Sequence, residues 1–368
     1  MNRDFVFDLR ETSGALGDLG TLLPLMIAAV ALGGLAPVPV LLGFAIFYVV
    51  TAFVYRLPVP VQPMKAMVAV MLVTSVPPGA LALAGAVVGA VLLVLGLTGW
   101  IDRLVRLVPQ SVISGLQLGL GLMLGFVALD LMAAEPLLGG LALLVLLALI
   151  RAGLPAALLF VGATLAVGWA LGLPGVEMVA PVDTGAEDVL AMGLGELALP
   201  QLSLTLTNAV LLTAIVMKDG FGVRAAHVTP RRLAITSGLA NLALTSFGAM
   251  PMCHGAGGAA AHRKFGARTG GAPLMIGLAL AALAILPDGF GLLAAVPAVA
   301  LGALLLVASA DLALSRRLFD AMPSCRPVIA VTALGVVLWN PLAGLILGTA
   351  AEVIRKAIVR RMFAGTRA

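Results

Sequence analysis

The chain has 368 residues, of which 61% are hydrophobic and 11% charged, with a formal net charge of +5. Soluble domains carry about 25% charged residues, so a mean hydropathy of +1.15 excludes a soluble enzyme, a nucleic-acid binder and a disordered chain. The long runs of Leu, Val, Ala and Gly indicate an all-α polytopic membrane protein and not a barrel of alternating strands.

Fourteen apolar segments are long enough to cross a bilayer or to lie half-buried within one. They cover residues 13–34, 38–55, 62–76, 80–99, 110–129, 136–150, 154–172, 201–217, 231–247, 252–263, 270–286, 289–309, 325–339 and 341–359. The polar stretch 173–200 separates seven segments from seven, so the second half enters the membrane from the opposite side. We therefore predict a 7+7 inverted repeat, 1–172 and 201–368, joined by an extracytoplasmic linker over 173–200.

The distribution of charge supports this count. With a cytoplasmic N-terminus, every Lys and Arg except Lys65 falls in a cytoplasmic loop or terminus, as the positive-inside rule requires. The extracytoplasmic loops carry only acids: Asp130, Glu135, Glu177, Asp183, Glu187, Asp188, Glu196 and Asp288. The sequence thus predicts a multi-pass protein of the inner (plasma) membrane with both termini in the cytoplasm, whose partners are the lipid bilayer and no nucleic acid.

The third segment of each half is short and opens with a stretch that is unfavourable for helix. We name the stretches 57–70 and 247–261 the first and second lead-in segments; Pro58, Pro60, Pro63 and Pro251 interrupt them. Each third segment is therefore predicted to be an extended strand followed by a half-helix. Inverted topology brings the two half-helix N-termini together near the midplane, where their N–H groups and partial positive charges form an anion site.

Two ionisable residues lie within predicted membrane segments. Lys65, at the start of the first half-helix, is either a cation that faces an anionic substrate or the partner of an acid such as Asp18. Asp18 is a candidate for the proton-coupling carboxylate, for the counter-ion of Lys65, or for a cap within a first span broken near Gly14, Gly17 and Gly20. The partial positive charges of the two helix N-termini and the charge of Lys65 together match the charge of a dianion. Ionised Asp18 would lower this positive sum, and protonation of Asp18 would restore it.

Other polar residues give weaker signals. Cys253 and His254 provide two possible metal ligands without a second pair, so we expect no metal and no cofactor. His254, and Gln62 at the matching position of the first half, could instead donate to an oxyanion. The charged loop 218–232 is typical of a cytoplasmic topology loop, although its Asp219 and Arg224 could lock one state of a transport cycle.

Four long motifs resemble the molybdate transporter family of plants and bacteria, which is related to the sulfate permease superfamily. They are GALGDLGTLLPL (14–25), PVQPMKA (60–66), DGFGVRAAHVTPRRLAITSGLANL (219–242) and PMCHGAGGAAAHRKFGARTGGAPLMIG (251–277). The resemblance implies a core domain from spans 1–4 and 8–11 and a gate domain from spans 5–7 and 12–14. It also implies a substrate site between spans 3 and 10, at Gln62, Lys65, Cys253, His254 and Gly255, and it raises the expectation of a homodimer.

The leading interpretation is a secondary transporter that imports a tetrahedral oxyanion, with molybdate as first candidate and sulfate as second. Charge and shape do not separate these two anions. A nucleobase carrier would need acids on spans 8 and 10, which the sequence lacks there. An anion channel is a further alternative, and an enzyme is not expected.

Overall fold

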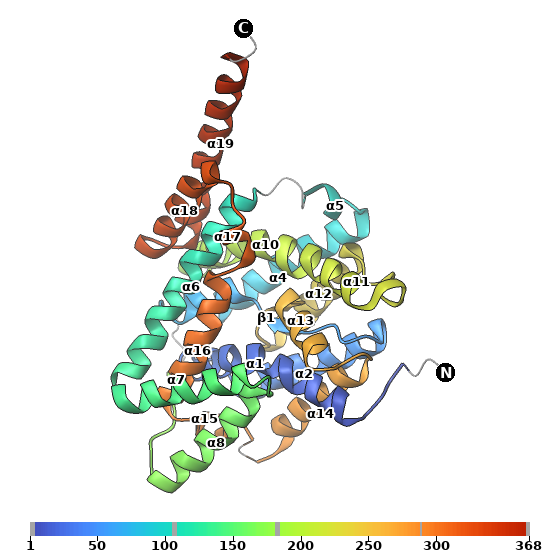
Figure 1. The fold of residues 1–368 in the computed structure, drawn as a ribbon, viewed down its shortest axis with the longest axis vertical. Helices are drawn as coiled ribbons and strands as arrows, with labels where there is room; N and C mark the ends of the chain where they lie inside the picture. Colours follow the sequence, from blue (N-terminus) through green and yellow to red (C-terminus); the bar gives the residue numbers. More distant parts are fainter. Residues whose placement is uncertain (1–3, 105–108, 181–184, 288, 366–368) are drawn as a thin grey trace.

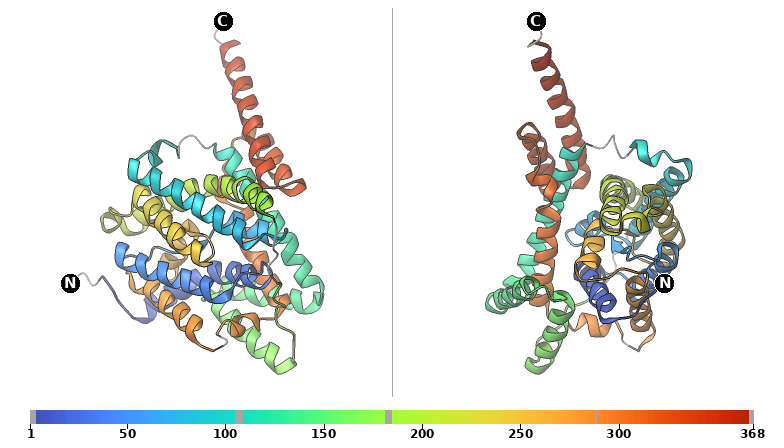
Figure 2. Two further views of the ribbon diagram at one scale, coloured as in Figure 1. Left: turned by 180° about the vertical axis from the view of Figure 1, so that it is seen from behind. Right: turned by 45° about the vertical axis from the view of Figure 1, so that its right-hand side comes forward.

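A computed structural model describes residues 4–104, 109–180, 185–287 and 289–365. Arg3, Arg106, Arg367, Asp183 and Asp288, used above to assign topology, lie outside these ranges. The fold is almost wholly helical and forms two bundles that lie side by side (Figure 1; Figure 2, right). α19 (Pro341–Gly365) extends well beyond the rest of the molecule.

The first bundle contains the helices of both lead-in segments. It consists of α1 (Leu9–Ala31), α2 (Pro37–Tyr55), α3 (Lys65–Met71), α4 (Pro78–Thr98), α9 (Ala186–Ala191), η1 (Met192–Ala198), α10 (Leu199–Leu204), η2 (Thr205–Leu212), α11 (Thr213–Phe221), η3 (Gly222–Ala225), α12 (Pro230–Leu244), η4 (Thr245–Phe247), α13 (Ala256–Lys264) and α14 (Gly271–Ile285). Proline stands at the first turn of α2, α4 and α12, where its missing N–H costs no hydrogen bond.

The second bundle is built around α6. It consists of α6 (Gln110–Ala133), α7 (Pro136–Arg151), α8 (Ala156–Leu171), α16 (Ala298–Ala313), α18 (Arg326–Leu338) and α19. The short elements α5 (Ile101–Leu104), α15 (Gly291–Ala294), α17 (Arg316–Phe319) and η5 (Pro323–Cys325) serve as connections. Glycines of α6 allow close packing, because a Cβ at Gly121 would lie 2.6 Å from Ala313 Cβ of α16.

Every predicted segment corresponds to a helix or a helical run. Five helices are long and apolar enough to cross a membrane: Leu9–Ala31, Pro37–Tyr55, Pro78–Thr98, Gln110–Ala133 and Glu187–Ala225. Five further apolar helices have 10–17 residues. The positions of the helices therefore agree with the fourteen predicted segments. The number of times that the chain crosses the membrane stays a prediction.

The predicted linker 173–200 is only partly a linker. Helix begins at Ala186 and continues through α9, η1 and α10 into the segment predicted to start at 201. Two acids in its first turn, Glu187 and Asp188, interact favourably with the N-terminal end of a helix dipole. Gly193 then lets this helix approach α4, since a Cβ there would lie 3.0 Å from the Ala80 carbonyl oxygen.

Helices from the two halves of the chain pack against one another in related pairs. Within the first bundle α2 packs on α14 and α4 on α12, while α1 contacts α13 and α3 contacts α10. In the second bundle α6 packs on α16 and α18, and α7 packs on α16. The core of the molecule is thus made by contacts between residues far apart in the sequence.

Candidate anion site

The two lead-in segments meet and pair as strands. β1 (Gln62–Pro63) is antiparallel to β2 (Met252–Cys253), with Gln62 opposite Cys253 and Pro63 opposite Met252. A further hydrogen bond joins Met64 N–H to the Pro251 carbonyl at 3.1 Å. The extended lead-ins predicted from the prolines are therefore confirmed, and their pairing satisfies backbone groups that would otherwise be buried without partners.

Each strand is followed within three residues by a short helix. Both helices start near the point where β1 and β2 pair, which we call the crossing. α3 begins at Lys65 and α13 at Ala256, and neither N-cap residue forms a side-chain cap. The Ala66 N–H of α3 donates instead to Gln201 Oε1 at 2.9 Å. The other first-turn N–H groups of the two half-helices lie near the crossing, where an anion could accept from them.

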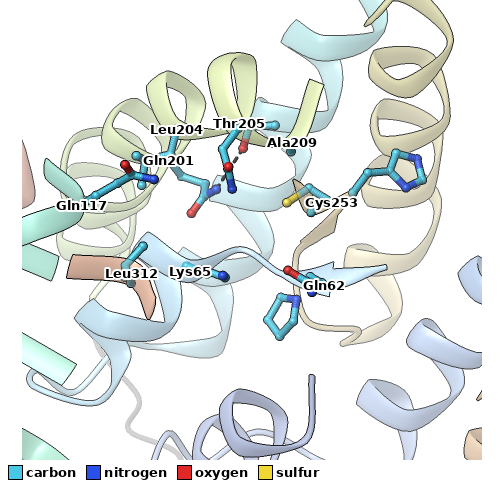
Figure 3. A pocket seen from close by; sticks show the side chains of 13 residues that line it. Gln62, Lys65, Gln117, Gln201, Leu204, Thr205, Ala209, Cys253 and Leu312 are labelled. Atoms are coloured by element: carbon cyan, nitrogen blue, oxygen red, sulfur yellow. Dashed lines mark hydrogen bonds between the residues drawn. The ribbon is translucent and has the colours of Figure 1, made fainter. Parts of the chain in front are cut away.

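A small cavity of about 20 Å³ lies at this crossing. All five residues predicted to form the substrate site line it, namely Gln62, Lys65, Cys253, His254 and Gly255. The remaining lining residues are Pro63, Gln117, Gln201, Leu204, Thr205, Asn208, Ala209 and Leu312. In Figure 3 the Lys65 side chain lies between Gln62 and Leu312, with Gln201 and Thr205 on the opposite wall.

Lys65 has no carboxylate within 4.0 Å among the described residues. Its proposed partner Asp18 contacts His262 instead, with Nε2 to Oδ2 at 3.1 Å. The interpretation of Lys65 and Asp18 as a structural ion pair is therefore wrong for this conformation. The ammonium of Lys65, on a partly buried residue, is available to an anion in the cavity.

Gln62 connects the cavity to a buried carboxylate. Its Nε2 donates to Asp18 Oδ1 at 3.1 Å and also contacts Thr21 Oγ1. Its Oε1 is buried and has no hydrogen-bond partner in the described structure. The amide group is thus held by its nitrogen, and it cannot at the same time donate freely to an anion as the sequence suggested.

His254 is fully engaged by the protein. Nδ1 lies 2.9 Å from the Pro60 carbonyl oxygen and Nε2 lies 2.8 Å from Thr236 Oγ1. A carbonyl oxygen only accepts, so Nδ1 carries the proton and Nε2 accepts from Thr236 in the neutral ring. His254 therefore fastens the second lead-in to the first, and neither ring nitrogen is free for an oxyanion in this conformation.

Two glutamines of the cavity were not singled out from the sequence. Gln201 accepts from the α3 N-terminus and donates to Thr205 Oγ1 at 2.9 Å. Gln117 comes from α6 of the second bundle, and its Oε1 is buried without a partner. The only sequence feature that could have indicated them is an amide side chain within an otherwise apolar helix. Amides at such positions also occur where they only hydrogen-bond two helices together, so the feature does not indicate a site.

Asp18 lies inside an unbroken helix. α1 runs from Leu9 to Ala31, so the alternative in which Asp18 caps a broken first span is wrong. The glycines serve close packing instead, because a Cβ at Gly14 would overlap Ala267 and one at Gly17 would overlap Phe265. α1 therefore approaches the C-terminal end of α13 closely, which brings the fully buried Asp18 against the fully buried His262.

Asp219 and Arg224 are both exposed and form no ion pair with each other in the described structure. Arg224 donates to the Arg268 carbonyl at 3.2 Å, which joins the 218–232 loop to the loop after α13. Both residues lie away from the cavity, so any gating role stays a hypothesis.

A second, larger cavity of about 580 Å³ lies between the same two bundles. α3 contributes Val70, and the segment after it contributes Leu72, Val73 and Thr74. α6 contributes Met123, Phe126 and Asp130, and Glu196 and Trp339 also line the cavity. Both α3 and α6 thus line the two cavities, which places the cavities along one interface between the bundles.

Comparisons with known proteins identify the family of this chain. A family model described as "Molybdate transporter of MFS superfamily" matches residues 10–124 and 193–312. Molybdate transporter 1 of Arabidopsis thaliana is 30% identical over 379 residues, which covers 86% of this chain and 81% of that protein. Molybdate transporter 2 of the same plant is 29% identical over 372 residues, covering 83% of this chain and 78% of that one.

The fold is similar to that of solved anion transporters. The overall structure of SLC26A9 matches with a TM-score of 0.71 and 14% identity, over 95% of this chain, and the chain spans 65% of the length of SLC26A9. The transmembrane domain of the cyanobacterium bicarbonate transporter BicA matches with a TM-score of 0.63 and 18% identity, over 92% of this chain and 96% of that one. Taken with the family match over most of its length, the chain belongs to the molybdate transporter family, a family of transporters and not of enzymes.

Proposed function

We propose that the protein is a secondary active transporter that imports a tetrahedral oxyanion, with molybdate as the first substrate to test and sulfate as the second. The single observation that supports this most is the position of Lys65. Its ammonium has no carboxylate partner among the described residues, and it lines a cavity at the start of two half-helices. A cation beside two sets of helix N-terminal N–H groups favours a compact dianion.

The proposed site is made by both repeats. Lys65 and Gln62 come from the first lead-in segment, and Cys253 and Gly255 come from the second. The anion would lie between the two half-helix N-termini, next to Lys65. Because the cavity holds only about 20 Å³, little more than a single water needs, the walls must separate slightly when an oxyanion enters.

Transport by alternating access is proposed to use the two bundles as core and gate. If each helix is replaced by its counterpart in the other half of the chain, the α2–α14 contact becomes the α4–α12 contact. In the same way the α1–α13 contact becomes the α3–α10 contact. This is the relationship expected of an inverted repeat. The first bundle would carry the anion past the second, which supplies Gln117 and Leu312 to the site.

The membrane arrangement is part of the same proposal. The protein would lie in the plasma membrane with both termini in the cytoplasm, and a homodimer through the gate domain stays an expectation of the fold. The distribution of basic residues supports the orientation. Proton coupling through Asp18 is also proposed, because this carboxylate contacts the cavity residue Gln62.

Uptake of radioactive molybdate into proteoliposomes tests the function. Micromolar external molybdate should enter saturably, faster with an inward proton gradient, and tungstate and sulfate should compete. Lys65→Ala should weaken apparent affinity roughly tenfold to a hundredfold, the effect of losing one hydrogen bond to a charged group. Lys218→Ala removes an equal charge from an exposed position of α11 and should leave uptake unchanged.

Three outcomes separate the alternatives. Uptake of sulfate but not molybdate would move the substrate assignment within the same class. Flux that rises linearly with concentration would indicate a channel. A folded protein that moves no oxyanion, or a Lys65→Ala variant with unchanged affinity, would contradict the proposed substrate or the proposed site.

A further inference from the structure

A histidine that the proposed transport site does not use lies against the carboxylate behind that site. His262, near the end of α13, and Asp18, in the middle of α1, are both fully buried, and His262 Nε2 lies 3.1 Å from Asp18 Oδ2. The other ring nitrogen, Nδ1, lies 3.0 Å from the Gly14 carbonyl oxygen. Because a carbonyl oxygen cannot donate, Nδ1 carries a proton.

This geometry locates a second, exchangeable proton. If Nε2 and Asp18 were both unprotonated, two lone pairs would face each other at 3.1 Å within a buried site. His262 Nε2 has no hydrogen-bond partner in the described structure, and a proton between the two atoms would remove that repulsion, whether it is formally an O–H of Asp18 or an N–H of His262. With this proton the pair is neutral overall, and without it the pair carries one buried negative charge.

Tyr48 gives the same carboxylate a second proton-dependent contact. Its hydroxyl lies 2.6 Å from Asp18 Oδ2 and 2.7 Å from the Val61 carbonyl oxygen, but it has only one hydrogen to donate. When Asp18 is ionised, the hydroxyl donates to the carboxylate. When the centre is neutral, its proton is shared between Asp18 and His262, so the carboxylate attracts the Tyr48 hydrogen less strongly and Tyr48 can donate to Val61 in the first lead-in segment.

The contacts lead from this cluster directly to the anion cavity. Asp18 Oδ1 accepts from Gln62 Nε2, Gln62 follows Val61 in the chain, and Gln62 lines the cavity with Lys65. A negative charge on the cluster would therefore repel an anion held beside Lys65. Removing that charge by protonation lowers the repulsion and lets Val61 accept from Tyr48.

Few other titratable groups face the cluster. Of the helices packed against α1 and α13, α8, α14 and α15 contribute none. The groups on the remaining elements are Tyr55 on α2, Lys65 on α3, Asp311 on α16, and Lys218 and Asp219 on α11. α1 and α13 themselves also carry Arg10, Glu11, Arg263 and Lys264. Lys65 interacts over a Coulombic distance first with Asp311 and also with Asp18, and Lys218 and Asp219 are exposed. His254 and Cys253 lie on the second lead-in, and His254 is held by Pro60 and Thr236.

A sodium ion fits the cluster less well than a proton. Hard cations are bound by several oxygen ligands, whereas the amide nitrogen of Gln62 and a ring nitrogen of His262 occupy two sides of the carboxylate. The hydroxyl oxygens that also lie there, of Tyr48 and Thr21, are already hydrogen-bonded to backbone carbonyls or to the carboxylate.

We propose that Asp18, Tyr48 and His262 form a buried proton-binding centre whose protonation strengthens anion binding at the adjacent Lys65 cavity. The proposal rests on the oxyanion transport proposed above and names the groups that carry the coupled proton. Each bound oxyanion would then take up one proton at this centre, and both would be carried inward together.

Histidine-selective NMR of the full chain tests this proposal. The protein has three histidines, so ring signals labelled with ¹⁵N and ¹³C can be assigned with His262→Gln and His227→Gln. His262 should show the Nδ1-protonated form when neutral and should gain a proton on acidification. Saturating molybdate should move the midpoint of that titration upward by about one pH unit, which corresponds to a tenfold coupling between proton and anion binding, while His227 should not respond.

Binding measured by calorimetry in the same samples separates the two proposals. Molybdate affinity in the wild type should fall about tenfold between the titration midpoint without molybdate and the midpoint with molybdate, and this slope should be absent in His262→Gln, with His227→Gln as the matched control. Molybdate that binds without moving the His262 titration, or an unchanged slope in His262→Gln, would overturn the proton centre and leave the transporter intact. A protein that binds neither molybdate nor sulfate would overturn the proposed function, and the coupling with it.

Discussion

Gln62 is the residue through which the cavity and the buried carboxylate contact each other. Its nitrogen is held by Asp18, and its unpartnered oxygen is buried beside the cavity. Gly255, the residue before α13, leaves room for it, since a Cβ there would overlap the Gln62 side chain. The position of Gln62 therefore depends on side-chain space supplied by the other half of the chain.

Two adjacent glycines of α13 make a matched test of this packing. A Cβ at Gly258 would lie 2.7 Å from Pro60 Cβ and would overlap Asp18 and Gln62, whereas one at Gly257 would meet nothing within 4 Å. Gly258→Ala should displace Gln62 from Asp18 and disturb the cavity wall, which should lower molybdate affinity about tenfold or more, the size of the lost Gln62–Asp18 hydrogen bond to a charged group. Gly257→Ala should bind as the wild type does; equal affinities for the two variants in a calorimetric titration would contradict this role of Gln62.

The sequence predicted the residues of the cavity better than it predicted their partners. Lys65 and Cys253 could be recognised because each lies in a proline-interrupted lead-in segment. His262 could not, because it belongs to a basic HRK run that is typical of a cytoplasmic helix end. Only the close approach of α1, permitted by Gly14 and Gly17, places His262 against Asp18.

At the scale of elements, close helix packing at glycines holds the halves of the first bundle together. Gly89 of α4 and Gly238 of α12 face each other, and a Cβ at Gly238 would lie 2.8 Å from both the Gly89 carbonyl oxygen and Leu93 N. Backbone atoms cannot move aside as the end of a side chain can. The α4–α12 contact therefore requires a residue without a side chain at this point.

Gly238→Ala should destabilise the protein by about 1–3 kcal/mol, the usual range for overpacking a tight contact. The thermal unfolding midpoint in detergent should fall by a few degrees. Gly162→Ala in α8 is the control, because a Cβ at Gly162 meets nothing within 4 Å. If the two variants unfold at the same temperature, the α4–α12 contact is looser than described.

The lengths of the apolar stretches predicted where most helices lie. They did not predict that a helix begins at Ala186. Glu187, Gly193 and Pro200 together are typical of a loop. In the structure the acid lies in a first helical turn, the glycine approaches α4, and the proline lies in the first turn of α10. Tertiary packing thus decided a boundary that local sequence preferences obscured.

At the scale of the whole molecule, the interface between the bundles connects the two cavities. α6 lines the small cavity with Gln117 and, about 9 Å further along the helix, lines the large one from Met123 onward. Leu120 and Leu124, which lie on the same stretch of α6, are almost completely buried. Movement of one bundle against the other would have to open this apolar stretch for an anion to pass.

The most direct measurement is the position of bound molybdate, located by the anomalous scattering of molybdenum in crystals or by density in cryo-EM maps of the full chain. The ion should lie at the crossing of β1 and β2, within hydrogen-bonding distance of Lys65 Nζ. Molybdate bound elsewhere, for example in the large cavity beside Asp130, with none at Lys65, would contradict the proposed site.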